Sequence, residues 1–226
     1  MAKCFKLEVI YEDNHLISVV KPPGMLSQKD RTGDRDIVFF VKDYLKRKYK
    51  KKGNVFLGHI HRLDRVAGGV MLFARTSKAA SRLSESMREN KIKKEYLLVV
   101  NGIMKKEKAR LIHFLKRDRD KNLVVAYDKK ISESLKEAVL DYEVLKTKKN
   151  LSFVKVLLHT GRHHQIRSQF KKIGHPIAGD VRYGKKDGLK YPALWSYAIE
   201  FVHPTKKEMV RIEKKPPKIF PWALFL

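Results

Sequence analysis

The spacing of apolar residues limits the fold of this chain more than any other feature. Short apolar runs recur along most of its length, and turn-forming residues separate them. Runs of this kind are typical of β-strands. They predict strands at residues 7–11, 16–20, 69–74, 94–100, 109–115, 122–127, 138–145, 151–158, 194–202 and 208–213. Many strands with few helices between them favour an α+β fold, with a mixed, largely antiparallel central sheet flanked by helices, over a doubly wound parallel sheet.

Two segments carry a longer helical repeat of apolar residues. Residues 36–48 predict an amphipathic helix, with Asp34 as its candidate N-cap. Its apolar positions are Ile37, Phe40, Val41, Tyr44 and Leu45. A second helix is expected to run from a cap at Thr76 through Arg88, and Asn90 is a suitable residue to end it.

The charge balance points to a polyanionic partner. Lysine and arginine total 51 residues against 24 acidic ones, which gives a formal net charge of +27. Such an excess attracts polyanions, and neutralising phosphates releases their counterions. An anionic membrane is the competing partner, but the sequence has no basic amphipathic anchor helix and no apolar run near the roughly 18 residues that span a bilayer. The composition therefore favours nucleic acid and disfavours a membrane.

Cysteine use and length indicate the setting and the size of the folded unit. Cys4 is the only cysteine, so neither a disulfide framework nor a cysteine-based zinc site is expected. The first residues lack the apolar core of a signal peptide, and a reducing cytoplasm is the simplest setting. A chain of 226 residues, 43% of them hydrophobic, suits one globular domain with a real core.

The segment richest in chemistry is residues 58–69, GHIHRLDRVAGG. Asp64 lies between Arg62 and Arg65, and a flexible Ala-Gly-Gly turn follows. Nearby cations keep a carboxylate ionised, which suits a nucleophile or a base. The glycines let backbone or substrate approach closely. Local composition alone fits an ordinary salt-bridged loop aspartate at least as well.

Histidines in the same segment raise the question of a metal site. His59 and His61 lie two positions apart and can share one face of a strand. No carboxylate or cysteine cluster completes such a site, and His163 and His164 are far away in the sequence, so we expect no metal. No Gly-Lys-Ser/Thr follows Gly68, so a phosphate-binding loop is not predicted either. The Gly-x-Ser-x-Gly pattern of serine hydrolases is also absent from the sequence.

A second polar segment, residues 159–167, joins a strand to a short helix expected at about 163–173. The buried stripe of that helix consists of Ile166, Phe170 and Ile173. Arg167 borders this stripe, so it is expected to be partly buried and to require a carboxylate partner. The start of the helix suits anion binding, because its first backbone N–H groups are free. The side chains there are Arg162, His164 and Gln165. The turn-rich segment 174–184 fits a purely structural loop.

Together these segments resemble the RluA/RsuA-type pseudouridine synthases, most closely the RluA branch. The chain carries the family's signatures in the family's order, over about residues 7–205. They are residues 9–16 with 21–24, 61–64 with Gly69, 94–96 leading to Gly102, 160–162 with 164–167, 174–177 with 179–180 and 183–184, and 201–204. Each signature is weak by itself, and the ordered set is highly specific.

The resemblance implies a cofactor-free isomerase with a catalytic cleft across the sheet. Such an enzyme detaches uracil from its ribose, rotates the base and rejoins it through carbon 5, which leaves pseudouridine in RNA. The target nucleotide is expected to flip out, because a stacked uridine hides its glycosidic carbon from any side chain.

The resemblance also assigns roles to individual residues. Asp64 matches the essential aspartate; whether it attacks the sugar, attacks the base or removes a sugar proton stays open. Tyr96 matches the tyrosine that packs on the uracil. Arg167 matches the arginine that pairs with the aspartate, and Arg62 matches the arginine that can enter the space left by the flipped nucleotide. Further RNA contacts are expected from Arg162, His164 and Gln165.

Some positions depart from the family's pattern. Ala67 and Gly68 stand where Thr-Ser is usual, His163 where threonine is usual, and Trp195 where histidine is common. The first change removes two hydroxyls near the active loop and leaves open how that loop is braced. The small N-terminal RNA-binding domain common in the family is not expected, because the first strand begins near residue 7. We therefore expect one monomeric catalytic domain, residues 1–226, that grips RNA by itself.

Three functions compete at this point. The first is isomerisation of specific uridines in structured RNA, either ribosomal or transfer RNA. The second is a non-catalytic RNA-binding protein on the same fold, which the altered turn after Asp64 and the large charge motivate. The third is a metal-dependent nuclease that uses Asp64 and histidines, and the lack of a second carboxylate cluster disfavours it. The intact set of Arg62, Asp64, Tyr96 and Arg167 favours the first.

Overall fold

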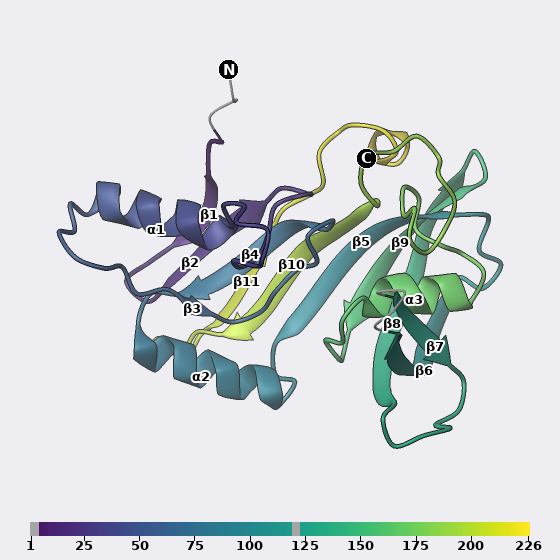
Figure 1. Cartoon of the computed structure of the whole chain (residues 1–226), viewed down its shortest axis with the longest axis horizontal. Coiled ribbons are helices and arrows are strands. Elements are labelled where there is room, and N and C mark those ends of the chain that lie inside the picture. The colour runs from purple at the N-terminus through teal and green to yellow at the C-terminus, as the bar shows by residue number, and fades with distance from the viewer. Residues whose placement is uncertain (1–4, 119–122) are drawn as a thin grey trace. The chain divides into compact units, whose positions relative to one another are not determined.

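The computed structural model describes residues 5–118 and 123–226, which divide into two compact units (Figure 1). The first unit contains Met1–Ile92 and Ala198–Lys214. The second contains Lys93–Tyr197 and Lys215–Leu226. Cys4 and the first residue of the predicted strand 122–127 lie outside the described residues.

The sheet of the first unit is built around β4 (Gly68–Ala74), which directly follows the Asp64 segment. β1 (Glu8–Glu12) pairs antiparallel with β2 (Leu16–Lys21), and β2 pairs antiparallel with β4. The two-residue strand β3 (Gly58–His59) also pairs antiparallel with β4. Every residue of β4 is buried. The strand that starts just after Asp64 is therefore a fixed part of the core.

Two helices cover opposite faces of this sheet. Successive residues of a strand point to opposite faces, so neighbouring residues of β4 pack in different helix clusters. Figure 1 shows strands of the unit between the two helices. The apolar cluster at α1 (Ile37–Lys48) includes Ile37, Val41, Leu45, Met71 and Phe73. The cluster at α2 (Ser77–Arg88) includes Ala79, Leu83, Val70, Leu72 and Ala74. The end of β10 (Leu194–Val202) pairs antiparallel with β11 (Met209–Glu213) and adds residues to the α2 cluster.

Both helices of the first unit begin at a side-chain cap. The Thr76 hydroxyl accepts a first-turn backbone N–H of α2 at 3.2 Å, as predicted. The prediction that Asp34 caps α1 is wrong. Asp36 directly precedes this helix, and its Oδ1 accepts a first-turn N–H at 2.8 Å. The residue next to the first turn is the one that reaches its free N–H groups. Asp34 instead forms an exposed ion pair with Arg65 at 2.5 Å.

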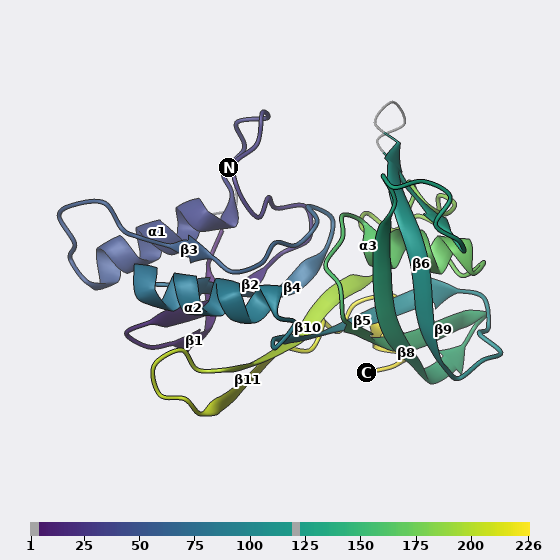
Figure 2. The ribbon, with the colours of Figure 1, turned by 90° about the horizontal axis from the view of Figure 1, so that it is seen from below.

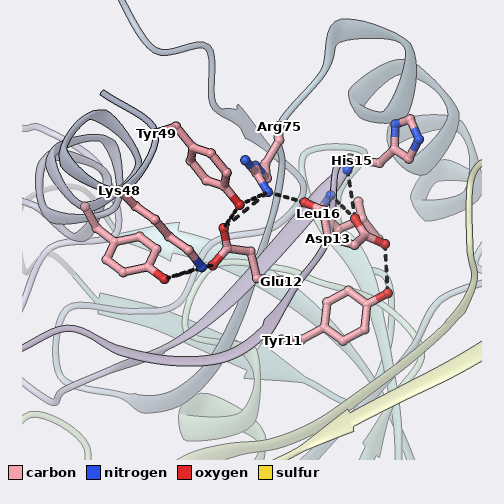
Figure 3. A network of polar contacts seen from close by, with 9 residues as sticks. Tyr11, Glu12, Asp13, His15, Leu16, Lys48, Tyr49 and Arg75 are labelled. Atoms are coloured by element: carbon pink, nitrogen blue, oxygen red, sulfur yellow. Dashed lines mark hydrogen bonds and ion pairs between the residues drawn. The ribbon is translucent and has the colours of Figure 1, made fainter. Parts of the chain in front are cut away.

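Glu12, the last residue of β1, ties this strand to the end of α1 (Figure 3). Its carboxylate accepts hydrogen bonds from the Lys48 ammonium at 2.7 Å and from the hydroxyls of Tyr49 at 2.7 Å and Tyr44 at 2.9 Å. The Arg75 guanidinium contacts it at 3.2 Å. Burial by itself would raise the pKa of Glu12, but the hydrogen bonds outweigh burial and lower the pKa. Glu12 is therefore a charged anchor of the first unit.

Asp13 closes the predicted turn between β1 and β2 (Figure 3). Its Oδ1 accepts the backbone N–H groups of His15 at 2.8 Å and Leu16 at 2.7 Å. Its Oδ2 accepts the Tyr11 hydroxyl at 2.9 Å and lies 2.8 Å from Nε2 of His203. An aspartate that bonds the backbone two residues ahead stabilises a turn by itself. The signature at residues 9–16 thus has a structural explanation in this unit.

The second unit is an antiparallel sheet with the strand order β5-β9-β8-β6-β7 (Figures 1 and 2). Its strands are β5 (Lys93–Asn101), β6 (Lys108–Asp118), β7 (Leu123–Tyr127), β8 (Lys136–Lys148) and β9 (Leu151–Leu158). The helix α3 (Gln165–Lys172) packs on one face, where the rings of Phe170 and Tyr142 are 5.8 Å apart. The 3-10 helix Trp222–Leu224 reaches Phe153, whose position alternates with the α3-facing residues of β9.

The described elements confirm the predicted α+β class with a largely antiparallel sheet. The predicted helix at about 163–173 is confirmed with slightly narrower bounds. Strand β3 and the 3-10 helix were not predicted, because two or three residues are too few to show a period. Within the described part of the chain, every helix is too short or too polar to cross a membrane.

Candidate active-site residues in the two units

The turn that carries Asp64 is held by its own backbone and by β4. The Ala67 N–H donates to the Asp64 carbonyl at 3.0 Å. Nε2 of His61, three residues before Asp64, accepts the backbone N–H of Leu72 in β4 at 3.0 Å. Gly69 enters β4 with a φ of +118°, a region that glycine adopts without steric cost. The residues on both sides of Asp64 are therefore attached to the buried strand.

A distant segment, residues 21–27, clamps the two direct neighbours of Asp64. The Ser27 hydroxyl accepts the Leu63 N–H at 3.0 Å and donates to the Leu63 carbonyl at 2.6 Å. The Gly24 N–H donates to the Arg65 carbonyl at 2.8 Å. The residues on both sides of Asp64 are therefore held in place although Ala-Gly stands where Thr-Ser is usual. One of the clamping groups is a hydroxyl from Ser27, 36 positions before Leu63.

Lys21 adds a buried cation beneath the same loop. Its side chain is fully buried, and its ammonium donates to the carbonyls of Met25 at 2.8 Å, Pro22 at 3.1 Å and Arg65 at 3.2 Å. Burial lowers the pKa of Lys21 to about 7, although the nearby Asp64 carboxylate acts to raise it. Arg65 acts in the lowering direction. Lys21 and Asp64 are therefore electrostatically coupled within the first unit.

The two arginines that flank Asp64 have different surroundings. Arg62 is exposed, which suits contact with a large ligand. Arg65 donates from Nε to the Gly24 carbonyl at 3.0 Å and pairs with Asp34 at 2.5 Å. Arg65 had no predicted role, and the structure gives it one: it links the Asp64 loop to the segments around residues 24 and 34.

In the second unit, Arg167 forms a buried, two-pronged ion pair with Asp180. Nε contacts Oδ2 at 2.7 Å and a terminal nitrogen contacts Oδ1 at 2.8 Å, with the side chains 4% and 1% exposed. The guanidinium also lies 4.9 Å from the centre of the Tyr183 ring. The expectation that Arg167 is buried and paired with a carboxylate is confirmed, and Asp180 is a partner that sequence reasoning missed. Pairing of Arg167 with Asp64 stays a prediction.

His164 is also buried, directly before α3. It has a left-handed backbone with a φ of 50°, which histidine tolerates better than most residues. Its Nδ1 lies 2.9 Å from the Tyr183 hydroxyl, whose oxygen accepts the Val124 N–H at 2.8 Å. Burial, with Arg167 and His163 nearby, lowers the pKa of His164 to about 2. The imidazole is therefore held in its neutral form beside the Tyr183 hydroxyl.

Gln165 and Arg162 complete the start of α3. The Gln165 Oε1 accepts the Thr160 hydroxyl at 2.8 Å and the Arg162 N–H at 3.1 Å, and its Nε2 donates to the Val139 carbonyl at 3.2 Å. The side chain is buried. Arg162 is exposed and donates from Nε to the Glu137 carbonyl at 3.0 Å. Gln165 thus shapes the loop that presents Arg162. RNA contacts by these residues and by His164 stay predictions.

Tyr96 faces the same side of the second unit's sheet as α3. It pairs in register with Val156 of β9, which pairs with Tyr142 of β8. Cross-strand partners point to the same face, and the Tyr142 ring contacts Phe170 of α3. Tyr96 is buried on that face. Tyr96 therefore lies on the face that α3 covers, and Arg167 is a residue of α3 itself.

The chain is similar to known proteins over most of its length. A model of the RNA pseudouridylate synthase family matches residues 15–172. The tRNA pseudouridine synthase C of Haemophilus influenzae is 34% identical over 91% of this chain and 91% of its own length. An uncharacterized RNA pseudouridine synthase of Aquifex aeolicus is 32% identical over 95% of this chain and 71% of its own. The solved structure of human RNA pseudouridylate synthase domain containing 4 matches with a TM-score of 0.79 at 19% identity, over 96% of this chain and 91% of that one.

The structural likeness defines a class, since the fold is that of the pseudouridylate synthases. The family model and the relatives identify more: the chain belongs to the RNA pseudouridylate synthase family. It is an RNA uridine-to-pseudouridine isomerase, as its sequence resemblance implies. The non-catalytic alternative is not favoured.

Sequence reasoning missed several side chains that shape these sites. Lys21 and Asp180 lie within recognised signatures but had no assigned role. Ser27 lies outside every signature, and nothing in its local sequence indicates that it clamps Leu63. Signatures could have pointed to the first two, whereas a contact across 36 positions is found only by folding the chain.

Proposed function

We propose that this protein isomerises specific uridines in structured transfer or ribosomal RNA, with Asp64 as the essential catalytic group. The N1–C1′ bond of the uridine breaks and a C5–C1′ bond forms, while the C5 proton is lost to water and N1 gains a proton. Tyr96 packs on the uracil, and Arg167 pairs with the Asp64 carboxylate and keeps it charged. Further RNA contacts come from Arg62, Arg162, His164 and Gln165. The enzyme is a monomer in the cytoplasm, with one catalytic domain over residues 1–226 and without cofactor or metal.

The clamped loop is the observation that carries the assignment to Asp64. Residues 21–27 hold both Leu63 and Arg65, so the backbone position from which the Asp64 side chain extends is fixed. A catalytic group gains rate from such placement, because little orientation entropy is lost when substrate binds. An ordinary salt-bridged surface aspartate needs no such bracing.

The substrate class is proposed from charge and from the relatives. The relatives' names specify transfer RNA in some cases and the large ribosomal subunit in others. The net charge of +27 supports a large RNA ligand, because many phosphates can be neutralised at once. The same charge supports the predicted ability of the catalytic domain to grip RNA by itself.

The test is tritium release from RNA labelled at uracil carbon 5. The wild-type protein should release label from a cellular RNA fraction, and Asp64→Asn should abolish release while RNA binding persists. Asp43→Asn is a matched control, because Asp43 is an exposed aspartate of α1 that pairs with Arg47. This control should keep full activity.

Two results would count against the proposal. Folded wild-type protein that releases no label from any RNA fraction would remove the isomerase function. An Asp64→Asn variant with the wild-type rate would leave that function in place and remove Asp64 from its centre.

A further inference from the structure

Lys94 is a buried lysine beside Tyr96 that the proposed reaction does not use. The two residues lie two positions apart on β5, so both side chains point to the α3-covered face. Lys94 is only 8% exposed. Its Nζ reaches the loop before α3: a β-carbon added to Gly161 would lie 3.9 Å from it. The ammonium is therefore placed between the Tyr96 strand and the loop that presents Arg162.

The ammonium of Lys94 has no hydrogen-bond or ion-pair partner among the residues that the structure describes. Burial is the cause that lowers its pKa. By contrast, Lys155 on the opposite face of the same sheet pairs with Glu95 at 3.0 Å. A buried cation without a counter-ion destabilises a fold. Because the charge of Lys94 does not stabilise the fold, its position indicates that the ammonium pairs with an anion of a bound ligand.

We propose that Lys94 binds a backbone phosphate of the RNA substrate, next to the uridine that packs on Tyr96. The inference rests on the proposed function and extends it to a residue of the same face. Phosphate is the group of RNA that carries full negative charge at neutral pH, and a desolvated ammonium gains most from a full charge. Residues two apart on a strand are separated by about 7 Å, so the amine reaches the backbone beside the base rather than the stacked base itself.

The experiment compares three variants with the wild type on an RNA fraction that the wild type modifies. Lys94→Met removes the charge and keeps the length of the side chain. Lys94→Arg keeps the charge. Lys93→Met is the matched control, because Lys93 is the adjacent, exposed lysine on the other face of β5. KM and kcat come from tritium release, and the dissociation constant is measured over a series of salt concentrations.

Lys94→Met should raise KM and the dissociation constant about ten-fold and reduce the slope of log affinity against log salt by about one. Lys94→Arg should restore most of the affinity, and Lys93→Met should change KM much less. The melting temperature of Lys94→Met should equal or exceed that of the wild type, because an uncompensated buried charge is removed.

Three results would overturn the inference. One is a KM and salt slope of Lys94→Met that match the wild type. Another is a loss of kcat at unchanged KM, which would place the amine at the uracil or the reacting atoms. The last is a lower melting temperature with unchanged binding, which would make Lys94 a structural residue. A wild-type protein that releases no tritium would instead remove the proposed function, and the salt slope would still test Lys94.

Discussion

Asp64 is positioned by side chains that are far from it in the sequence. Ser27 bonds both backbone groups of Leu63, and Lys21 donates to the carbonyl of Arg65. Lys21 is the last residue of β2, and Ser27 lies in the segment that follows this strand. Lys21 is also close enough to Asp64 for the carboxylate to act on its pKa. The proposed catalytic residue therefore lies close to a lysine whose own charge changes near neutral pH.

Replacing Lys21 by methionine should change how stability depends on pH. The pKa of Lys21 falls from 10.5 to about 7 on folding, so the unfolded chain binds more protons between these values. Stability of the wild type should rise with pH across this window, by at most about 1.4 kcal/mol per unit, and this contribution should be constant below pH 7. Lys21→Met should lack the rise. Urea unfolding of both proteins between about pH 6 and pH 9 measures it, and a constant difference above pH 7 would contradict the lowered pKa.

Removing one partner of the buried Arg167–Asp180 pair should destabilise the second unit strongly. Asp180→Asn leaves the guanidinium buried without its counter-charge, and such losses cost about 3–5 kcal/mol. Asp141→Asn is the matched control, because Asp141 forms an equally two-pronged pair with Arg110 that is exposed to solvent. Denaturant unfolding should show a much smaller loss for this control. Equal losses would mean that burial does not decide the effect.

The two faces of the second unit's sheet carry different kinds of side chain. In the second unit, Tyr96 lies on the face that α3 covers, where Phe170 of this helix is buried next to the Tyr142 ring. The opposite face carries a row of ion pairs across neighbouring strands. The pairs are Lys155 with Glu95, Lys108 with Glu143, and Arg110 with Asp141. Strand alternation therefore separates the face with these ion pairs from the face that carries Tyr96.

The cap of α1 gives a prediction at the scale of this element. Asp36→Ala should lower the free energy of unfolding by about 1 kcal/mol, because a first-turn N–H loses its acceptor. Asp34→Ala should cost less, since Asp34 contributes an exposed ion pair with Arg65 rather than a cap. Urea unfolding of both variants tests the order. A larger loss for Asp34→Ala would show that the ion pair, and not the cap, stabilises this region.

The whole molecule is dominated by its positive charge. The excess of 27 lysines and arginines over acidic residues is far more than a single nucleotide site could use. Many of the acidic residues are already engaged in ion pairs, such as Glu12 with Lys48 and Asp128 with Lys172. The remaining cations supply a field that attracts RNA irrespective of its sequence. Recognition of a particular uridine must then come from groups near the site.

RNA binding by the whole protein should weaken steeply as salt increases. Each phosphate neutralised releases condensed counterions, so log affinity should fall linearly with log salt. A protein that makes several phosphate contacts should lose about a thousand-fold in affinity between roughly 50 and 200 mM salt. Filter binding or fluorescence anisotropy with one structured RNA measures the slope. Affinity that stays constant over this range would contradict an electrostatic grip.

The sequence alone determined the features that depend on local order. Periodicity located most strands and all three α-helices of the described chain, because the side chains of a strand or helix repeat at short, regular intervals. The ordered motifs led to the family and to Asp64, Tyr96 and Arg167. The sequence was a poorer guide to the N-cap of α1, because Asp34 and Asp36 are both suitable capping residues. The exact start of the helix decides between them.

Only the tertiary structure decided the partners of these residues. Asp180 pairs with Arg167 because the loop after α3 folds back over the helix, and Ser27 clamps Leu63 because β2 lies beside β4. Contacts of this kind depend on how elements stack, and the spacing of residues along a strand or helix carries no information about which distant segment will pack against it. Asp64 could thus be recognised from its neighbours in the sequence, whereas the residues that hold it in place are its neighbours in space.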